Sequence, residues 1–183
     1  MNQNDPLAGL PEVPSFTVTS PDVAHDQELP REQYSGLFGV PGGKDKSPAL
    51  SWSGAPPETK SYVVTVYDPD APTGCGFWHW IVTNIPASVT ELPAGAGDEG
   101  GKNLPSGALA LRHDAGSTRF IGAGPPPGHG PHRYFIIVQA LDVDDVGKLG
   151  VTADSTPAFL GFSILQHVLA RAVITPWGEV PAG

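Results

Sequence analysis

The chain has 183 residues, of which 39% are hydrophobic, and a formal net charge of −9. This length and composition predict one folded domain with a sizeable core and exclude a disordered chain. The ten Lys and Arg residues form no basic stripe, so we expect no nucleic-acid partner and no attraction to an anionic membrane surface.

The first 70 residues of the chain contain three strand candidates. Residues 1–14 are polar and interrupted by prolines, and they predict a loosely ordered N-terminal arm before a single domain at 15–183. Residues 16–20 alternate apolar and polar side chains, the period of a half-buried strand. After a Gly-rich irregular region, 49–53 and 61–67 are the next candidates, the latter rich in β-branched and aromatic residues.

Further strands are expected at 78–85, briefly at 89–92, and over the apolar run 133–141, which we expect to be central to its sheet. Glycines over 95–106 indicate a loop between them. These short strands, separated by turn residues, predict a mostly β protein with an antiparallel β-sandwich.

A C-terminal helix is expected after these strands, because apolar residues recur at helical spacing from Gly161 to Ala172. Thr156 followed by Pro157 supplies an N-cap and a first-turn proline. Pro176 would end this helix shortly after Ile174. The helix would carry His167 as a structural or a surface residue.

Two loops rich in proline and glycine carry the candidate functional residues. The first follows the strand at 61–67, and the second precedes the strand at 133–141. Alternate residues of a strand share one face, so four polar side chains could converge at one end of the sheet. These are Asp68, His79, His132 and Tyr134.

This group of side chains suits a phosphate-type anion. Histidine and tyrosine supply N–H and O–H donors, and the backbone at Gly122 and Gly124 could approach a ligand closely. The carboxylates of Asp68 and Asp70 could receive the ammonium of a zwitterionic head group. The alternative is that both carboxylates only cap backbone N–H groups within a turn.

Enzyme motifs are absent from the sequence. It contains no G-x-S-x-G, no P-loop and no zinc-ligand spacing. We therefore expect no catalytic residues, no cofactor and no metal, and we keep a hydrolase or metal-dependent enzyme as the weaker alternative.

The motifs DPDAP, WHWIVTNIP and GPPPGHG followed by HRY resemble the signature of the phosphatidylethanolamine-binding protein family, most closely its bacterial, Raf kinase inhibitor-like branch. The resemblance covers about residues 16–174. It implies a Greek-key β-sandwich with a pocket for phosphate-type anions and phospholipid head groups. By this resemblance, the ligand-binding residues are Asp68, Asp70, Pro72, Phe77, His79, Asp114, Gly124, His132 and Tyr134.

The same resemblance implies other partners. Relatives include interaction proteins that inhibit a kinase or a protease, and bacterial relatives are often homodimers. The chain departs from the bacterial pattern at His113, where an asparagine is common, and at Pro131, an insertion before His132. These departures leave the role of His113 open, while Asp114 stays a candidate neighbour of the pocket.

The expected location is cytoplasmic. Cys75 is the only cysteine, which fits a reducing compartment, and the N-terminus lacks the pattern of a signal peptide. No apolar run approaches the roughly 18 residues of a bilayer-crossing helix, so we expect no stable membrane insertion.

Overall fold

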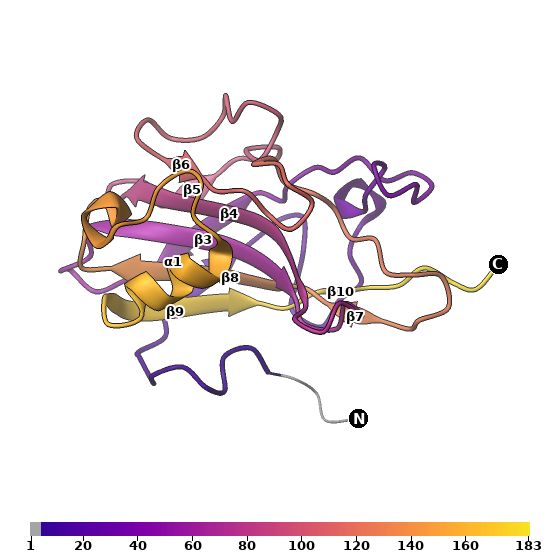
Figure 1. Ribbon diagram of the computed structural model, residues 1–183, viewed down its shortest axis with the longest axis horizontal. Helices are drawn as coiled ribbons and strands as arrows, with labels where there is room; N and C mark the ends of the chain where they lie inside the picture. Colours follow the sequence, from indigo (N-terminus) through magenta and orange to yellow (C-terminus); the bar gives the residue numbers. More distant parts are fainter. Residues whose placement is uncertain (1–4) are drawn as a thin grey trace.

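The largest sheet has five antiparallel strands in the order β6-β4-β3-β8-β9 (Figure 1). The computed structural model describes residues 5–183. The central strand β3 and its neighbour β8 are distant in sequence, as in Greek-key connections. The five strands are β3 (Ser61–Asp68), β4 (Phe77–Pro86), β6 (Leu109–Ala110), β8 (Phe135–Leu141) and β9 (Val168–Ile174).

A second sheet packs against the first. It contains β1 (Thr17–Thr19), β2 (Leu50–Ser53) and β5 (Glu91–Leu92), all antiparallel. Buried side chains of both sheets meet in one hydrophobic core, where Trp52 of β2 contacts Tyr62 of β3 edge to face. The predicted antiparallel β-sandwich is confirmed.

The predicted strand at 133–141 is divided in two at Tyr134. Its first part, β7 (His132–Arg133), pairs with β10 (Trp177–Gly178) in a separate two-stranded sheet. Its second part, β8, belongs to the large sheet. Between them, the backbone N–H of Tyr134 donates to the carbonyl of Pro176 at 2.9 Å. The chain therefore changes sheet within the segment that carries two candidate site residues.

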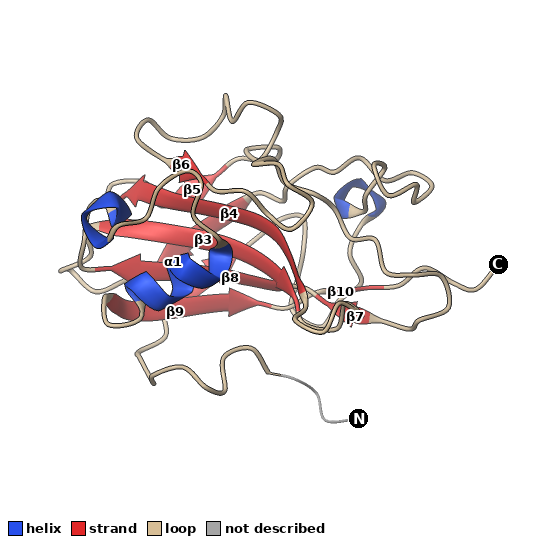
Figure 2. Ribbon diagram, viewed as in Figure 1, coloured by secondary structure: helices blue, strands red, loops and turns tan. Residues whose placement is uncertain are grey.

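The outer face of the large sheet is covered by the α-helix α1 (Pro157–Ile164), which Figure 2 shows lying over β8 and β9. A second hydrophobic cluster fills the space beneath it and beneath the short 3-10 helix η2 (Val146–Leu149). The other 3-10 helix, η1 (Arg31–Gln33), lies in the long connection between β1 and β2. Within residues 5–183, no helix has the length and apolar character required to cross a bilayer.

The C-terminal helix begins where it was predicted to begin, but it is shorter than predicted. The Thr156 side chain accepts a hydrogen bond from the Phe159 backbone, which confirms the N-cap, and the helix ends at Ile164. The prediction was wrong for the rest, because Val168–Ile174 is strand β9 with alternating burial. The small and apolar residues of this segment fit the helical period and the strand period equally well. The segment forms a strand because it pairs with β8. His167 lies in the turn between these elements.

A β-bulge in β4 changes which side chains share a face. Val66 of β3 pairs with Trp80 and Tyr67 pairs with Trp78, so His79 has no partner on β3. The extra residue places Trp78 and Trp80 on opposite faces, whereas simple alternation predicts the same face. The bulge also turns His79 toward the same side as Asp68.

Residues 5–14 run past the edge strand β9. The backbone N–H of Arg171 donates to the Pro14 carbonyl at 3.0 Å, and the Arg171 carbonyl accepts a hydrogen bond from the Phe16 N–H at 3.2 Å. Residues 1–4 of the predicted arm lie outside the described residues. The division into a loose arm at 1–14 and one domain at 15–183 stays a prediction.

Candidate functional site

A pocket of about 290 Å³ lies where β3 ends, β4 begins and the second Pro/Gly loop passes; we call it the strand-end pocket. Both predicted loops contribute to it, so residues more than 50 positions apart in sequence share one wall. The residues lining it are Phe38, Asp68, Ala71, Pro72, Thr73, Phe77, His79, Gly124, Pro126 and His132.

Asp68 ends strand β3 with a buried carboxylate. Its Oδ1 accepts hydrogen bonds from the backbone N–H groups of Asp70 and Ala71, at 2.8 and 3.0 Å. Its Oδ2 lies 2.7 Å from Nδ1 of His132. The carboxylate therefore caps a turn, as the alternative expected, and also holds a histidine of the second loop. One side chain fixes the two loops against each other.

His132 is buried, and both of its ring nitrogens are occupied. Because Nδ1 donates to Asp68, Nε2 is available to a second group, and Nδ1 of His129 lies 2.7 Å from it. His129 is exposed at the outer end of this chain of three side chains. A hydrogen bond between two histidine nitrogens holds one proton, so the bond is lost when both rings are fully protonated.

His79 is buried, and its two ring nitrogens differ in their surroundings. Nδ1–H donates to the carbonyl of Ile121 at 2.9 Å. Among the residues that the structure describes, Nε2 has no hydrogen-bond partner. Burial lowers the pKa of His79, so the ring is neutral at pH 7 and Nε2 offers a lone pair.

Two aromatic rings hold His79 in place. Phe77 is the cross-strand partner of Asp68, and its ring centroid lies 5.0 Å from that of His79. The ring centroid of Tyr134 lies 5.2 Å from that of His79 in an edge-to-face contact. The Tyr134 side chain is buried, and burial raises the pKa of its hydroxyl well above the usual value. Tyr134 lies behind His79 and does not line the strand-end pocket itself.

Asp70 does not line the strand-end pocket. Its Oδ2 accepts from the backbone N–H and Nε of Arg133, at 2.9 and 2.8 Å, and its Oδ1 accepts from the same guanidinium at 2.7 Å. Burial opposes ionisation of Asp70, but the hydrogen bonds from Arg133 outweigh it and lower the pKa. Asp70 and Arg133 thus form a hydrogen-bonded ion pair, which is the second link between the loops after the contact of Asp68 with His132.

Asp114 also lies outside the pocket lining. Its Oδ2 accepts from the Trp78 backbone N–H at 2.8 Å, next to the bulge at His79. The neighbouring His113 is buried, accepts from the Ala115 N–H at 3.0 Å and lies 2.9 Å from the Ser117 hydroxyl. Burial and the nearby His79 lower the pKa of His113 to about 4. The structure thus assigns His113 a place in shaping this turn.

The two glycines of the second loop have different surroundings. The N–H of Gly122 donates to the Asp45 carboxylate at 2.8 Å, so this N–H faces the protein and not a ligand. Gly124 lines the pocket, and a Cβ there would lie 2.7 Å from the Phe38 ring. Only glycine therefore lets Phe38 lie over the pocket at this position. Every peptide bond of the described chain is trans, including those before Pro69 and Pro72.

Sequence reasoning did not predict four residues of the pocket lining, Phe38, Ala71, Thr73 and Pro126, nor His129 behind His132. His129 precedes His132 by three residues in a Gly-rich turn, and this spacing was a signal that could have been read. Phe38 had no such signal, because it comes from a segment 30 residues before Asp68. It packs edge to face on Phe77, with 6.1 Å between ring centroids. Over residues 5–183, no three His, Cys, Asp or Glu side chains are grouped as ligands of one metal ion.

Comparisons with known proteins agree in pointing to one family. The family model described as "Phosphatidylethanolamine-binding protein" matches residues 19–177. UPF0098 protein YbcL of Escherichia coli is 46% identical over 166 residues, which cover 91% of this chain and 88% of that protein. UPF0098 protein YbhB of the same organism is 43% identical over 156 residues, covering 85% of this chain and 95% of that protein.

A solved structure extends the similarity to three dimensions. The crystal structure of E. coli YbcL, described as a new member of the mammalian PEBP family, superposes with a TM-score of 0.85 and 44% identity. The superposition covers 91% of this chain and 99% of that one.

Proposed function

The chain belongs to the phosphatidylethanolamine-binding protein family, and from this premise we propose that its strand-end pocket binds a small phosphate ester or a phospholipid head group. The observation that supports this most is Nε2 of His79, a buried atom of a residue in the pocket wall that has no hydrogen-bond partner in the described chain. A buried polar group without a partner costs about 1–3 kcal/mol, and native proteins leave few of them.

A phosphate group would supply a hydrogen-bond partner to Nε2 of His79. At pH 7 the neutral His79 accepts a hydrogen bond from a protonated phosphate oxygen, and after taking up a proton it donates to a deprotonated one. The Tyr134 ring packs edge to face with the His79 ring on the side away from the strand-end pocket lining.

An ammonium group would find favourable surroundings in the same pocket. The carboxylate of Asp68 forms part of the wall, and the rings of Phe38 and Phe77 stand beside it. Carboxylates and aromatic faces both attract organic cations. A zwitterion with phosphate and amine, such as phosphoethanolamine, therefore suits this pocket better than a bare anion.

We propose binding without catalysis, since neither the sequence motifs nor the pocket lining supplies an activated nucleophile. Inhibition of a kinase or protease, homodimer formation and a cytoplasmic location stay predictions. Cys75 is exposed, as a free thiol in a reducing compartment can be.

Calorimetric titration tests the proposal, with phosphoethanolamine, inorganic phosphate and ethanolamine as ligands and His132→Ala as the variant. We expect saturable binding of the two phosphates, tighter for the zwitterion, and a loss of affinity in the variant. Ethanolamine alone should bind weakly. Absence of binding at millimolar concentrations of phosphoethanolamine would reject the proposal.

A further inference from the structure

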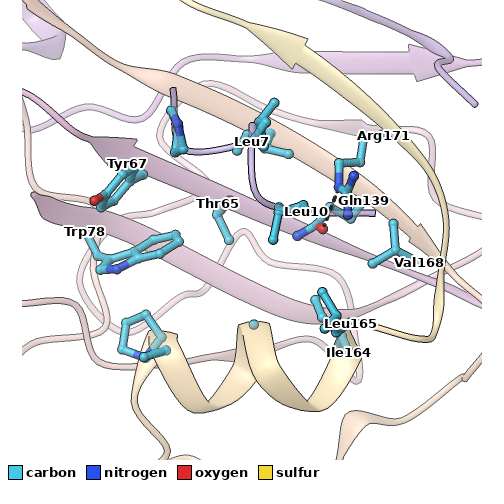
Figure 3. Close-up of a pocket in the computed structure, with 15 residues that line it drawn as sticks. Leu7, Leu10, Thr65, Tyr67, Trp78, Gln139, Ile164, Leu165, Val168 and Arg171 are labelled. Carbon is cyan, nitrogen blue, oxygen red and sulfur yellow. Dashed lines mark hydrogen bonds between the residues drawn. The ribbon is translucent and has the colours of Figure 1, made fainter. Parts of the chain in front are cut away.

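A second cavity of about 270 Å³ lies on the outer face of the large sheet, away from the strand-end pocket. We call it the outer groove. Figure 3 shows it between helix α1 and the N-terminal segment that carries Leu7 and Leu10. Its walls are mostly apolar, with Trp78 of β4 at one end and Ile164 and Val168 toward the other.

The sheet itself separates the two cavities. Tyr67 and Trp78 are cross-strand partners whose side chains line the outer groove, whereas the next pair, Asp68 and Phe77, lines the strand-end pocket. A ligand in one cavity therefore does not touch a ligand in the other, although β3 and β4 supply walls to both.

Arg171 is the cationic residue of the outer groove. One terminal nitrogen donates to the Pro11 carbonyl at 2.8 Å, and Nε lies 3.4 Å from Oε1 of Gln139. Both partners are neutral, and no carboxylate of residues 5–183 lies within ion-pair distance of this guanidinium. Burial lowers the pKa of Arg171, which reflects its partly desolvated position.

An arginine in such surroundings favours an anionic partner. A desolvated charge without a counter-charge costs free energy, and a carboxylate that accepts two parallel hydrogen bonds offsets this cost well. The guanidinium has five N–H donors, of which the two described bonds use two. In a chain with a net charge of −9, this local cation is the feature of the groove that selects the sign of a ligand's charge.

We propose that the outer groove binds a medium-chain carboxylate, with its alkyl chain against Trp78, Ile164 and Val168 and its carboxylate on Arg171. The volume of 270 Å³ equals that of about nine water molecules at ~30 Å³ each, which is the size range of a medium-length alkyl chain. Apolar walls with few placed polar groups are typical of small-molecule sites. This site is independent of the one in the strand-end pocket.

The N-terminal segment forms one side of the groove. Leu7 and Leu10 contribute to the lining, and the Pro11 carbonyl ties the same segment to Arg171. Leu10 is 37% exposed, so an alkyl chain under it would complete the burial of this side chain. The segment thereby serves as a cover that a bound chain stabilises.

Indole N–H resonances in ¹H–¹⁵N spectra test the proposal on the full chain. The sequence has four tryptophans, and Trp78→Phe assigns the resonance of Trp78. Sodium decanoate below its micellar range should shift the Trp78 signal saturably and leave that of Trp80, on the opposite face, in place. Decanol and decyltrimethylammonium should bind at least about tenfold more weakly, because neither offers a carboxylate to Arg171.

Variants separate the role of Arg171 from general apolar binding. Arg171→Gln should weaken decanoate binding about tenfold, Arg171→Lys should retain part of the affinity, and His132→Ala should have no effect. Leu10→Ser should weaken binding without altering the sheet. No shift at Trp78, or equal binding of decanol and decanoate, would overturn the proposal. So would a dimer in sedimentation experiments that protects Trp78 and excludes decanoate.

Discussion

The exposed His129 and the buried His132 are joined by a hydrogen bond of 2.7 Å between Nδ1 and Nε2, and the other nitrogen of His132 is held by Asp68. His132 lines the strand-end pocket, but its ring is already bound at both ends. A ligand that uses Nε2 of His132 must therefore displace His129. This relationship makes His129 a competitor for the proposed ligand.

Replacing His129 should strengthen ligand binding. In His129→Ala, Nε2 of His132 can carry a proton toward the ligand, and one hydrogen bond of this kind contributes about 0.5–1.5 kcal/mol, or about twofold to tenfold in affinity. Titration calorimetry with phosphoethanolamine at pH 7 measures the effect, with the exposed His25→Ala as a control. Weaker binding in His129→Ala would mean that His129 itself contacts the ligand.

The pH dependence of binding should report on His79. Burial lowers its pKa in the free protein, and a bound phosphate favours the protonated ring, so binding is accompanied by proton uptake. Affinity should then rise as the pH falls from 8 toward ~6, near the usual pKa of histidine. Calorimetry in two buffers of different ionisation enthalpy detects the uptake.

A variant at the same position serves as the control for this pH effect. His79→Gln carries an amide that needs no proton to donate, and we expect its affinity profile to be flatter and its proton uptake to vanish. An unchanged slope in His79→Gln would place the titrating group elsewhere in the pocket.

The ion pair between Asp70 and Arg133 should contribute more to the stability of the fold than to the affinity for a ligand. Asp70→Asn removes the charge that receives three hydrogen bonds from Arg133, and we expect a loss of about 1–2 kcal/mol in the free energy of unfolding. Urea unfolding at pH 7 measures it. Asp144→Asn, in the exposed pair with Lys148, is the matched control and should change stability much less than Asp70→Asn.

The pH dependence of the Asp70 contribution has a definite sign. The pKa of Asp70 is lower in the folded protein than in the unfolded chain, so the stabilisation is present above the unfolded value, ~3.9, and is lost as the pH falls through the folded value. A difference between wild type and Asp70→Asn that persists at pH 2 would contradict this assignment.

His113 should make the fold sensitive to acid. Its pKa is about 4 in the folded protein and ~6.5 in the unfolded chain, so between these values the unfolded chain binds more protons. Stability is therefore complete above pH 6.5 and falls as the pH drops to 4. Solvent screening limits the effect to about 1–2 kcal/mol.

His113→Asn should remove this part of the acid sensitivity. The asparagine oxygen can accept the Ala115 N–H in the same turn, so we expect little loss at pH 7. Thermal unfolding of both proteins from pH 7 to 4 measures the difference. Parallel curves would show that another group causes the acid dependence.

Local pattern was sufficient for most of the strands and for the start of the helix. Alternation at 16–20, the β-branched run at 61–67 and the Thr156-Pro157 cap depend on a few neighbouring residues, and each predicted element forms there. The same pattern placed Asp68 and His79 near one end of the sheet, although the bulge in β4 sets the face on which His79 lies. The sequence by itself thus determined the β-sandwich and the location of the pocket.

The tertiary structure decided what no short window of sequence contains. Val168–Ile174 is a strand because its backbone pairs with β8. The strand predicted at 133–141 is divided at Tyr134 because β7 pairs with β10, more than 40 residues later in the chain. The bulge at His79 arises from the register with β3.

Side-chain partners were decided in the same way. The resemblance placed both Asp68 and Asp70 in the pocket, but Asp70 binds Arg133, and Phe38 reaches the pocket from a distant loop. Hydrogen bonds and ring contacts form between whichever groups the packed backbone brings within a few ångströms. Sequence patterns therefore specify the periods and turns of this protein, whereas its contacts depend on the complete set of strand pairings.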